Sequence, residues 1–314
     1  MVWKLSNRVT SSSFSGTRFN PIQIKNLFRE IGRNLWSRPR PPNFKSGKIL
    51  RPHVLIFSRN RACQLDGLLR SLNQISRYTS PVFVLWKSEG SGHTRSYQIL
   101  REQWPQLLWK EQEEFRRDLL ELLKNTDEET IMFCTDDGLF FTSPPRLAEP
   151  DWEKVAGVSL RLGRNARYCH PADEHYSIPK IHNAGGLLAW RWRKARGDFR
   201  VAYSLDAHIY PRKRILEVLQ RFDFSNPNQL EDRLNRFGSE DAPEWMLCPE
   251  QSCYVSLPIN RVNTEFTNRS GLQYPVSEKE LLARFLSGQR LDIKNVVSSV
   301  PKGPHQEYPL RWIQ

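Results

Sequence analysis

Between residues 50 and 137, short apolar runs alternate with stretches in which apolar residues recur every three or four positions. Apolar runs of this length are typical of buried strands, and the longer spacing is typical of helices with one face on a core. Strand–helix units of about 25 to 30 residues, repeated in this way, predict a mainly parallel sheet with right-handed crossovers. The predicted strands are 53–58, 81–86, 107–111 and 130–137, and the predicted helices are 65–75, 91–104 and 113–123.

After Gly138 the pattern is less regular, and residues 161–203 carry no clear period. Pro211 suits the first position of a helix, where a missing N–H costs nothing. Ser277 and Glu280 form a capping box, which marks the start of another helix. The predicted elements are strands at 154–160 and 253–260 and helices at 211–222, 227–234 and 277–286.

The N-terminal segment has a pattern of its own. From residue 24 to residue 36, apolar side chains share one stripe of a helix and Lys25, Arg29 and Arg33 share another. A basic amphipathic helix of this kind can lie on an anionic membrane surface. Packing onto the main domain or a partner is the alternative. Residues 37–52 are predicted to be a linker. The predicted organisation is a basic segment at 1–50, an α/β domain at 51–265 and a C-terminal extension at 266–314.

Charge and composition narrow the class of protein. Of the 314 residues, 39% are hydrophobic, which is enough to fill a core, and no apolar run reaches the roughly 18 residues of a membrane span. Residues 1–50 hold ten Lys or Arg and one acid, whereas the rest holds 37 basic and 33 acidic residues. The charge of the body of the protein is nearly balanced, so the sequence does not predict nucleic acid as a partner. Five Cys without paired CxxC spacing indicate reduced thiols and a cytoplasmic protein.

Polar side chains follow two of the predicted strands. Ser58, Arg59, Asn60 and Arg61 follow the first, and Asp136-Asp137 ends the fourth. Ligands of open α/β sheets bind at the carboxyl ends of the strands. Paired carboxylates there suit Mg²⁺ or Mn²⁺, and the basic residues suit a diphosphate carried by that ion. The alternative is that Asp-Asp-Gly is an ordinary turn.

The strand ending in SRNR, the helix after it and the run IMFCTDDGLFF resemble the GT-A glycosyltransferases, nucleotide-sugar-dependent enzymes with a Rossmann-like fold and a DxD-type metal motif. The resemblance covers about residues 51–265 and implies that this is the catalytic domain. It implies that Asp137 binds the metal on the donor diphosphate, that Asp136 reaches the ribose or a metal-bound water, and that residues 58–61 surround the nucleotide. The motif reads T-D-D, and Trp86-Lys87-Ser88 stands where many relatives carry an acid toward the base, so the nucleobase stays open.

The same resemblance implies roles further along the chain. Asp206 would be the acceptor-side base of an inverting enzyme, or else a turn residue before a helix. Glu231 and Asp232 are further acids, on a helix of surface type. The resemblance also implies that Gly185-Gly186 contacts the transferred sugar and that His305 completes the metal site; an ordinary turn and a surface histidine are the alternatives.

The sequence therefore predicts a metal-dependent, inverting glycosyltransferase that moves a sugar from a nucleotide-diphosphate sugar to a hydroxyl of a glycan or lipid-linked saccharide. The basic helix would place it at the periphery of a membrane. A nucleotidyltransferase is one alternative, although SRNRACQL lacks the usual Gly-rich loop. A non-catalytic α/β protein that binds a glycan or a membrane surface is the other.

Overall fold

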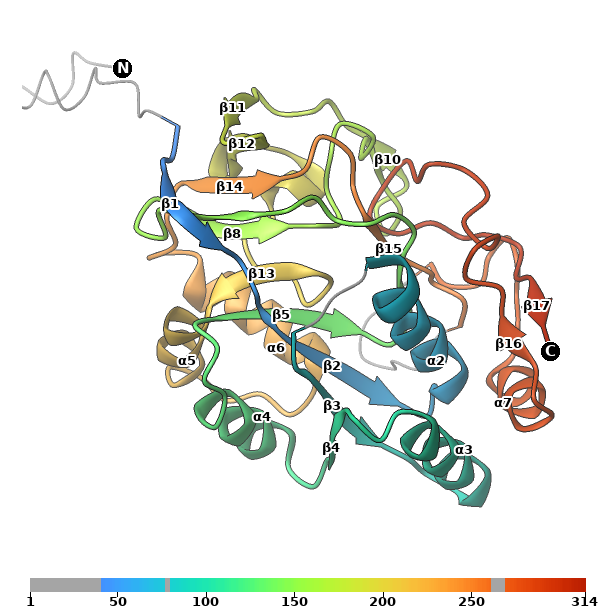
Figure 1. The fold of residues 1–314 in the computed structure, drawn as a ribbon. Helices are drawn as coiled ribbons and strands as arrows, with labels where there is room; N and C mark the ends of the chain where they lie inside the picture. Colours follow the sequence, from blue (N-terminus) through green and yellow to red (C-terminus); the bar gives the residue numbers. More distant parts are fainter. Residues whose placement is uncertain (1–40, 77–79, 261–268) are drawn as a thin grey trace, which may run out of the picture. The chain divides into compact units, whose positions relative to one another are not determined.

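The computed structural model describes residues 41–76, 80–260 and 269–314, which belong to one compact unit. The predicted helix at 24–36 lies outside the described residues. The central sheet has nine strands among the described residues (Figure 1). In spatial order they are β11 (His182–Ala184), β12 (Leu187–Arg191), β14 (Trp245–Cys248), β8 (Val155–Ser159), β13 (His208–Pro211), β5 (Thr130–Thr135), β2 (His53–Arg59), β3 (Val82–Lys87) and β4 (Leu108–Glu111).

The strand directions divide this sheet into two halves. The neighbours β5, β2, β3 and β4 are all parallel, as the sequence predicts for this part of the chain. In the other half, β13 runs antiparallel to both β5 and β8, and β14 runs parallel to β8. The predicted α/β class, with a sheet flanked by helices, is confirmed.

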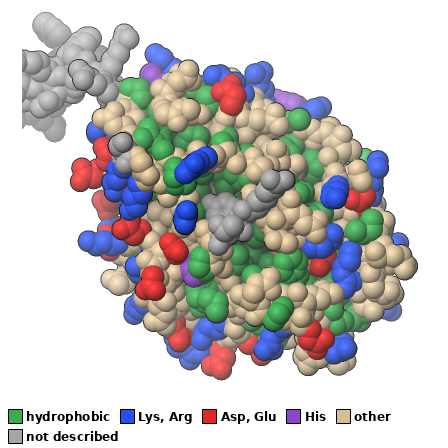
Figure 2. All heavy atoms as spheres, in the orientation of Figure 1, with side chains coloured by type: hydrophobic (Ala, Val, Ile, Leu, Met, Phe, Trp, Pro, Cys, Tyr) green, Lys and Arg blue, Asp and Glu red, His purple; other side chains and the backbone are tan. Residues whose placement is uncertain are grey.

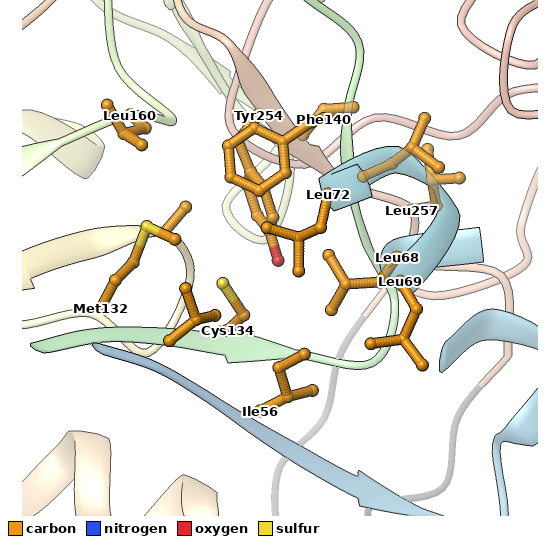
Figure 3. Packing of buried hydrophobic residues seen from close by; sticks show 14 of the residues in the cluster. Ile56, Leu68, Leu69, Leu72, Met132, Cys134, Phe140, Leu160, Tyr254 and Leu257 are labelled. Carbon is orange, nitrogen blue, oxygen red and sulfur yellow. The ribbon is translucent and has the colours of Figure 1, made fainter. Parts of the chain in front are cut away.

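Helices cover both faces of the sheet because its strands are apolar on both sides. Along β2, Val54 and Ile56 belong to one buried cluster, and Leu55 and Phe57 belong to the other. Figure 3 shows the first cluster, where leucines of α2 pack over Ile56 and Cys134. The first face carries α2 (Ala62–Ser71), α3 (Ser91–Gln103) and α7 (Glu278–Leu286), and the second carries α4 (Phe115–Lys124), α5 (Arg212–Leu219) and α6 (Pro227–Arg233).

Four small antiparallel pairs surround the main sheet. One of them corrects the predicted linker at 37–52: residues 44–49 form a strand whose Lys45 and Lys48 pair with the buried carboxylate of Glu149, at 2.6 and 2.9 Å. A polar strand at a sheet margin has no apolar period to reveal it. The pairs are β1 (Phe44–Ile49) with β7 (Ala148–Pro150), β6 (Gly138–Phe140) with β15 (Tyr254–Ser256), β9 (Tyr168–Cys169) with β10 (Glu174–His175), and β16 (Arg290–Leu291) with β17 (Trp312–Ile313).

Two further points bear on the predicted elements. Pro211 is the last residue of β13, and the next helix begins at Arg212. Pro211 therefore occupies the N-cap position of this helix and not the first helical position that the sequence predicts. No helix within 41–76, 80–260 and 269–314 is long and apolar enough to cross a membrane. On the face shown in Figure 2, basic and acidic side chains are mixed, and neither sign fills a large continuous area.

Candidate active site

The two acids after β5 lie opposite the loop after β2, because the parallel pairing of these strands brings their carboxyl ends together. Asp136 is buried. Its Oδ2 accepts hydrogen bonds from the Ser58 hydroxyl at 2.9 Å and the Arg59 amide at 3.2 Å. The guanidinium of Arg61 lies between the two acids, with Nη1 3.2 Å from both Asp136 Oδ1 and Asp137 Oδ2. The acids after β5 and the basic residues after β2 therefore face each other, as the sequence predicts.

A second group of charges surrounds Asp206. Arg161 Nη1 donates to Asp206 Oδ2 at 2.7 Å and to the Ser204 hydroxyl at 2.8 Å. The Thr135 hydroxyl links the two groups, since it contacts Asp206 Oδ1 and lies 2.9 Å from Asp137 Oδ1. Asp206 thus lies beside the acid pair, although 69 positions separate it from Asp137 in the sequence.

His305 reaches this group from the C-terminal part of the chain. The backbone of His305 forms a parallel bridge with Ser256, the last residue of β15. The His305 ring lies with Nδ1 3.3 Å from Arg161 Nη2 and Nε2 3.5 Å from Asp206 Oδ2. With the proton on Nε2, Nδ1 accepts from Arg161 and Nε2–H faces the carboxylate. The predicted C-terminal extension therefore contributes directly to the site.

The acids of the site have different electrostatic surroundings. Burial opposes ionisation of both Asp136 and Asp206. At Asp136 burial outweighs the attraction of Arg61 and, with the neighbouring charge of Asp137, raises the pKa to about 6. At Asp206 the contact with His305 and the charge of Arg161 outweigh burial, so the pKa lies below its ordinary value. Asp206 is held as a carboxylate.

Glu231 on α6 also belongs to the site, although its helix looked like a surface helix in the sequence. Its Oε1 accepts from the Leu205 amide at 3.0 Å. Burial raises its pKa, and the nearby negative charge of Asp206 adds to that effect. A carboxyl group with a raised pKa is suited to receive a proton in a reaction near neutral pH. The signal in the sequence was its position one helical turn after Pro227, where α6 begins.

Two cavities meet at these residues. The first, of about 370 Å³, lies at the carboxyl ends of β2 and β5; its wall includes Ser58, Arg59, Arg61 and both acids of the pair, over Phe57, Leu85 and Phe115. The second, of about 490 Å³, lies beside Arg161, Ser204 and Asn235. Both are lined by Asp206, Glu231 and His305. The arrangement offers two neighbouring spaces with acids at their junction.

Three predicted site residues lie elsewhere. Asn60 has a left-handed backbone (φ 56°), and its side chain accepts from the Glu89 amide at 2.8 Å, outside the larger cavities. Gly185 and Gly186, with φ of 55° and 81°, form the two-residue turn between β11 and β12 and line neither large cavity. Positive φ at both positions is what a tight hairpin requires. The structure does not bring the glycines to the acids.

The donor set bears on a divalent metal. Among the residues that the structure describes, no three His, Cys, Asp or Glu side chains are grouped so that they could hold an ion together. Asp136 is engaged by three donors, and His305 in the arrangement above has no free ring lone pair. Asp137 is more open than Asp136 and Asp206, with 21% of its side chain exposed against 7% and 11%. A hard cation fits here with Asp137 as the protein ligand, provided that phosphate and water oxygens complete its shell.

The sequence matches no protein-family profile. Among curated proteins, the bifunctional glycosyltransferase pgtA of Dictyostelium discoideum is 25% identical in an alignment of 213 residues that covers 58% of this chain. The chain spans 28% of the length of pgtA.

Solved structures also resemble the fold. The mannosyltransferase PcManGT from Pyrobaculum calidifontis, in complex with GDP-Man and Mn²⁺, is 15% identical and has a TM-score of 0.38, covering 71% of this chain and 64% of that one. S. aureus TarS 1–349 in complex with UDP-GlcNAc is 14% identical and has a TM-score of 0.43, covering 76% and 72%. In sequence, the chain is similar to a glycosyltransferase, which confirms the predicted likeness to this class of enzyme.

Proposed function

We propose that the chain is a glycosyltransferase that moves a sugar from a nucleotide-diphosphate sugar to a hydroxyl of a saccharide acceptor. The observation that carries the proposal is the meeting of two cavities at Asp206, Glu231 and His305. The first cavity has cationic walls suited to a diphosphate, from Arg59 and Arg61. The second has carboxylate, amide and hydroxyl groups suited to sugar hydroxyls. The similarity to pgtA supports the same reaction class.

In this proposal, the acceptor oxygen attacks the anomeric carbon of the donor sugar and the bond from that carbon to the diphosphate oxygen breaks. The acceptor proton passes to a carboxylate at the cavity junction. Glu231 is better suited to this role than Asp206, because the pKa of Glu231 is raised while His305 and Arg161 hold Asp206 as a carboxylate. Asp206 would orient the reacting sugar. A direct displacement of this kind inverts the anomeric centre.

A divalent ion, Mn²⁺ or Mg²⁺, would be held by Asp137 together with the donor diphosphate. When bound, it would neutralise charge on the leaving diphosphate. A glycan or lipid-linked saccharide as acceptor, a cytoplasmic location, attachment to a membrane surface through residues 24–36, and the boundaries at residues 50 and 265 remain predictions from the sequence.

The test is turnover of a panel of nucleotide sugars by the wild type, E231Q, D206N and E217Q. Glu217 is an exposed acid of α5 that lines neither large cavity, so E217Q is the matched control. E231Q should lower kcat by at least about 100-fold while donor binding persists, which is the usual range for a lost proton acceptor. E231Q turnover within threefold of the control would exclude Glu231 as the base, and no turnover or donor binding by the wild type would exclude the transferase.

A further inference from the structure

The acid pair already has a cation. Arg61 precedes α2, and its Nη1 lies at equal distances of 3.2 Å from Asp136 Oδ1 and Asp137 Oδ2. Its Nη2 donates to the carbonyl oxygen of Asn260. Only 14% of the side chain is exposed. The guanidinium is therefore fixed from two sides in the space that an ion shared by the two carboxylates would need.

A metal ion and this guanidinium compete for the same oxygens. A divalent ion bonded to Asp137 Oδ2 would lie about 2.0 to 2.6 Å from that oxygen, closer than the nitrogen that now contacts it. A metal ion and the Arg61 guanidinium that both contact Asp137 Oδ2 would be close neighbours, and two cations so close in a partly buried site repel strongly. The ion can therefore bind Asp137 with full strength only when Arg61 has released that carboxylate.

A diphosphate is the group most able to draw Arg61 away. Arginine pairs with phosphate through two parallel N–H bonds, a stronger arrangement than the single Nη1 contact now shared between two acids. Arg61 also lines the first cavity, so a diphosphate bound there lies within its reach. The remaining bond to the Asn260 carbonyl provides a fixed point about which the guanidinium can turn.

We propose that Arg61 is a resident cation that closes the acid pair until a nucleoside diphosphate binds, so that metal binding at Asp137 depends on the diphosphate. This inference rests on the proposed function for the nature of the donor. Because coupling between two ligands is reciprocal, the metal strengthens diphosphate binding by the same factor. A metal alone finds the site blocked.

The test is Mn²⁺ binding followed by the electron paramagnetic resonance signal of the free ion, with the wild type, R61M, R61M/D137N and R95M, each without nucleotide and with ADP, GDP or UDP. R95M also removes a positive charge, but Arg95 is an exposed residue of α3 that pairs with Glu102 at 3.9 Å and lines neither large cavity. R61M should bind Mn²⁺ without nucleotide at least tenfold more tightly than the wild type, and D137N should abolish that gain. R95M should stay within about twofold of the wild type.

The wild type gives an independent result, which matters if R61M fails to fold. Its Mn²⁺ affinity should rise at least tenfold with the diphosphate that binds. Equal affinity with and without a bound diphosphate, or an R61M affinity equal to that of the wild type, overturns the inference. If none of the diphosphates binds but R61M gains Mn²⁺ affinity, Arg61 is confirmed as the resident cation and the proposed donor is wrong.

Discussion

The charge group around Arg161 permits a quantitative test of what holds the site together. Only 7% of the Arg161 side chain is exposed, and its guanidinium contacts Asp206 at 2.7 Å and Asp198 at 3.3 Å. R161M keeps the apolar length of the side chain and removes the charge. Both carboxylates then stay buried without their cation, so the variant pays for their desolvation without the attraction that offset it.

The expected loss follows from this geometry. Removing one partner of a buried ion pair usually costs about 3 to 5 kcal/mol in the free energy of unfolding, and we expect R161M to fall in that range. R164M is the matched control, because Arg164 makes an exposed pair with Glu250 that should contribute at most about 1 kcal/mol. Urea unfolding at pH 7 gives both values.

The double variant R161M/D206N separates the pair from general packing. Since Asp206 is the closest partner of Arg161, neutralising it should recover part of the loss, with a coupling free energy of at least about 1 kcal/mol. A loss below about 1 kcal/mol in R161M, or a double variant that is simply additive, would show that the charges around Asp206 are not held by Arg161.

Two further expectations concern residues away from these charges. A Cβ at Gly138 would lie 1.5 Å from Tyr254 Oη, so G138A should lower the free energy of unfolding by at least about 3 kcal/mol in thermal or urea unfolding. In the control G67A, the new Cβ has its nearest neighbour at 3.4 Å, and the stability should stay within about 1 kcal/mol of the wild type. Similar stabilities of G138A and G67A would contradict the packing of β6 on β15. Burial lowers the pKa of His53 to about 4 from 6.5, so the unfolded chain binds the extra proton first and stability should decrease as pH falls from 6.5 toward 4, with a slope of up to about 1.4 kcal/mol per pH unit. H53Q should lack this contribution, and equal slopes in urea titrations of the two proteins would refute it.

The parallel half of the fold could be predicted because each of its elements carries its own period. The leucines of α2 recur at helical spacing, and β2 and β5 are uninterrupted apolar runs. The strands β13 and β14 could not be found in this way. Each has four residues, too few to show a period, and they form strands because neighbouring strands complete their hydrogen bonds.

Only part of the site could be predicted, because only some of its residues follow elements with a clear period. Asp136 and Asp137 follow a clear strand, so their place at the sheet edge could be inferred. Arg161 also follows a predicted strand, but a single arginine in an irregular stretch of sequence does not indicate an ion pair with Asp206, 45 positions away. The sequence does not show that Glu231 belongs to the site, because it shows the period of α6 but not the Leu205 amide that donates a hydrogen bond to the Glu231 carboxylate. Long-range pairing of charges is a property of the folded chain.

The C-terminal segment that carries His305 affects the order in which the site is assembled during synthesis of the protein. Glu307 is buried and accepts hydrogen bonds from the consecutive amides of residues 272–274, next to Arg269 and Ser270 in the wall of the first cavity. Translation is vectorial, and domains fold as their residues emerge from the ribosome. The nine strands of the central sheet among the described residues are therefore all synthesised before His305, and the reaction site is completed only after residue 305 has emerged.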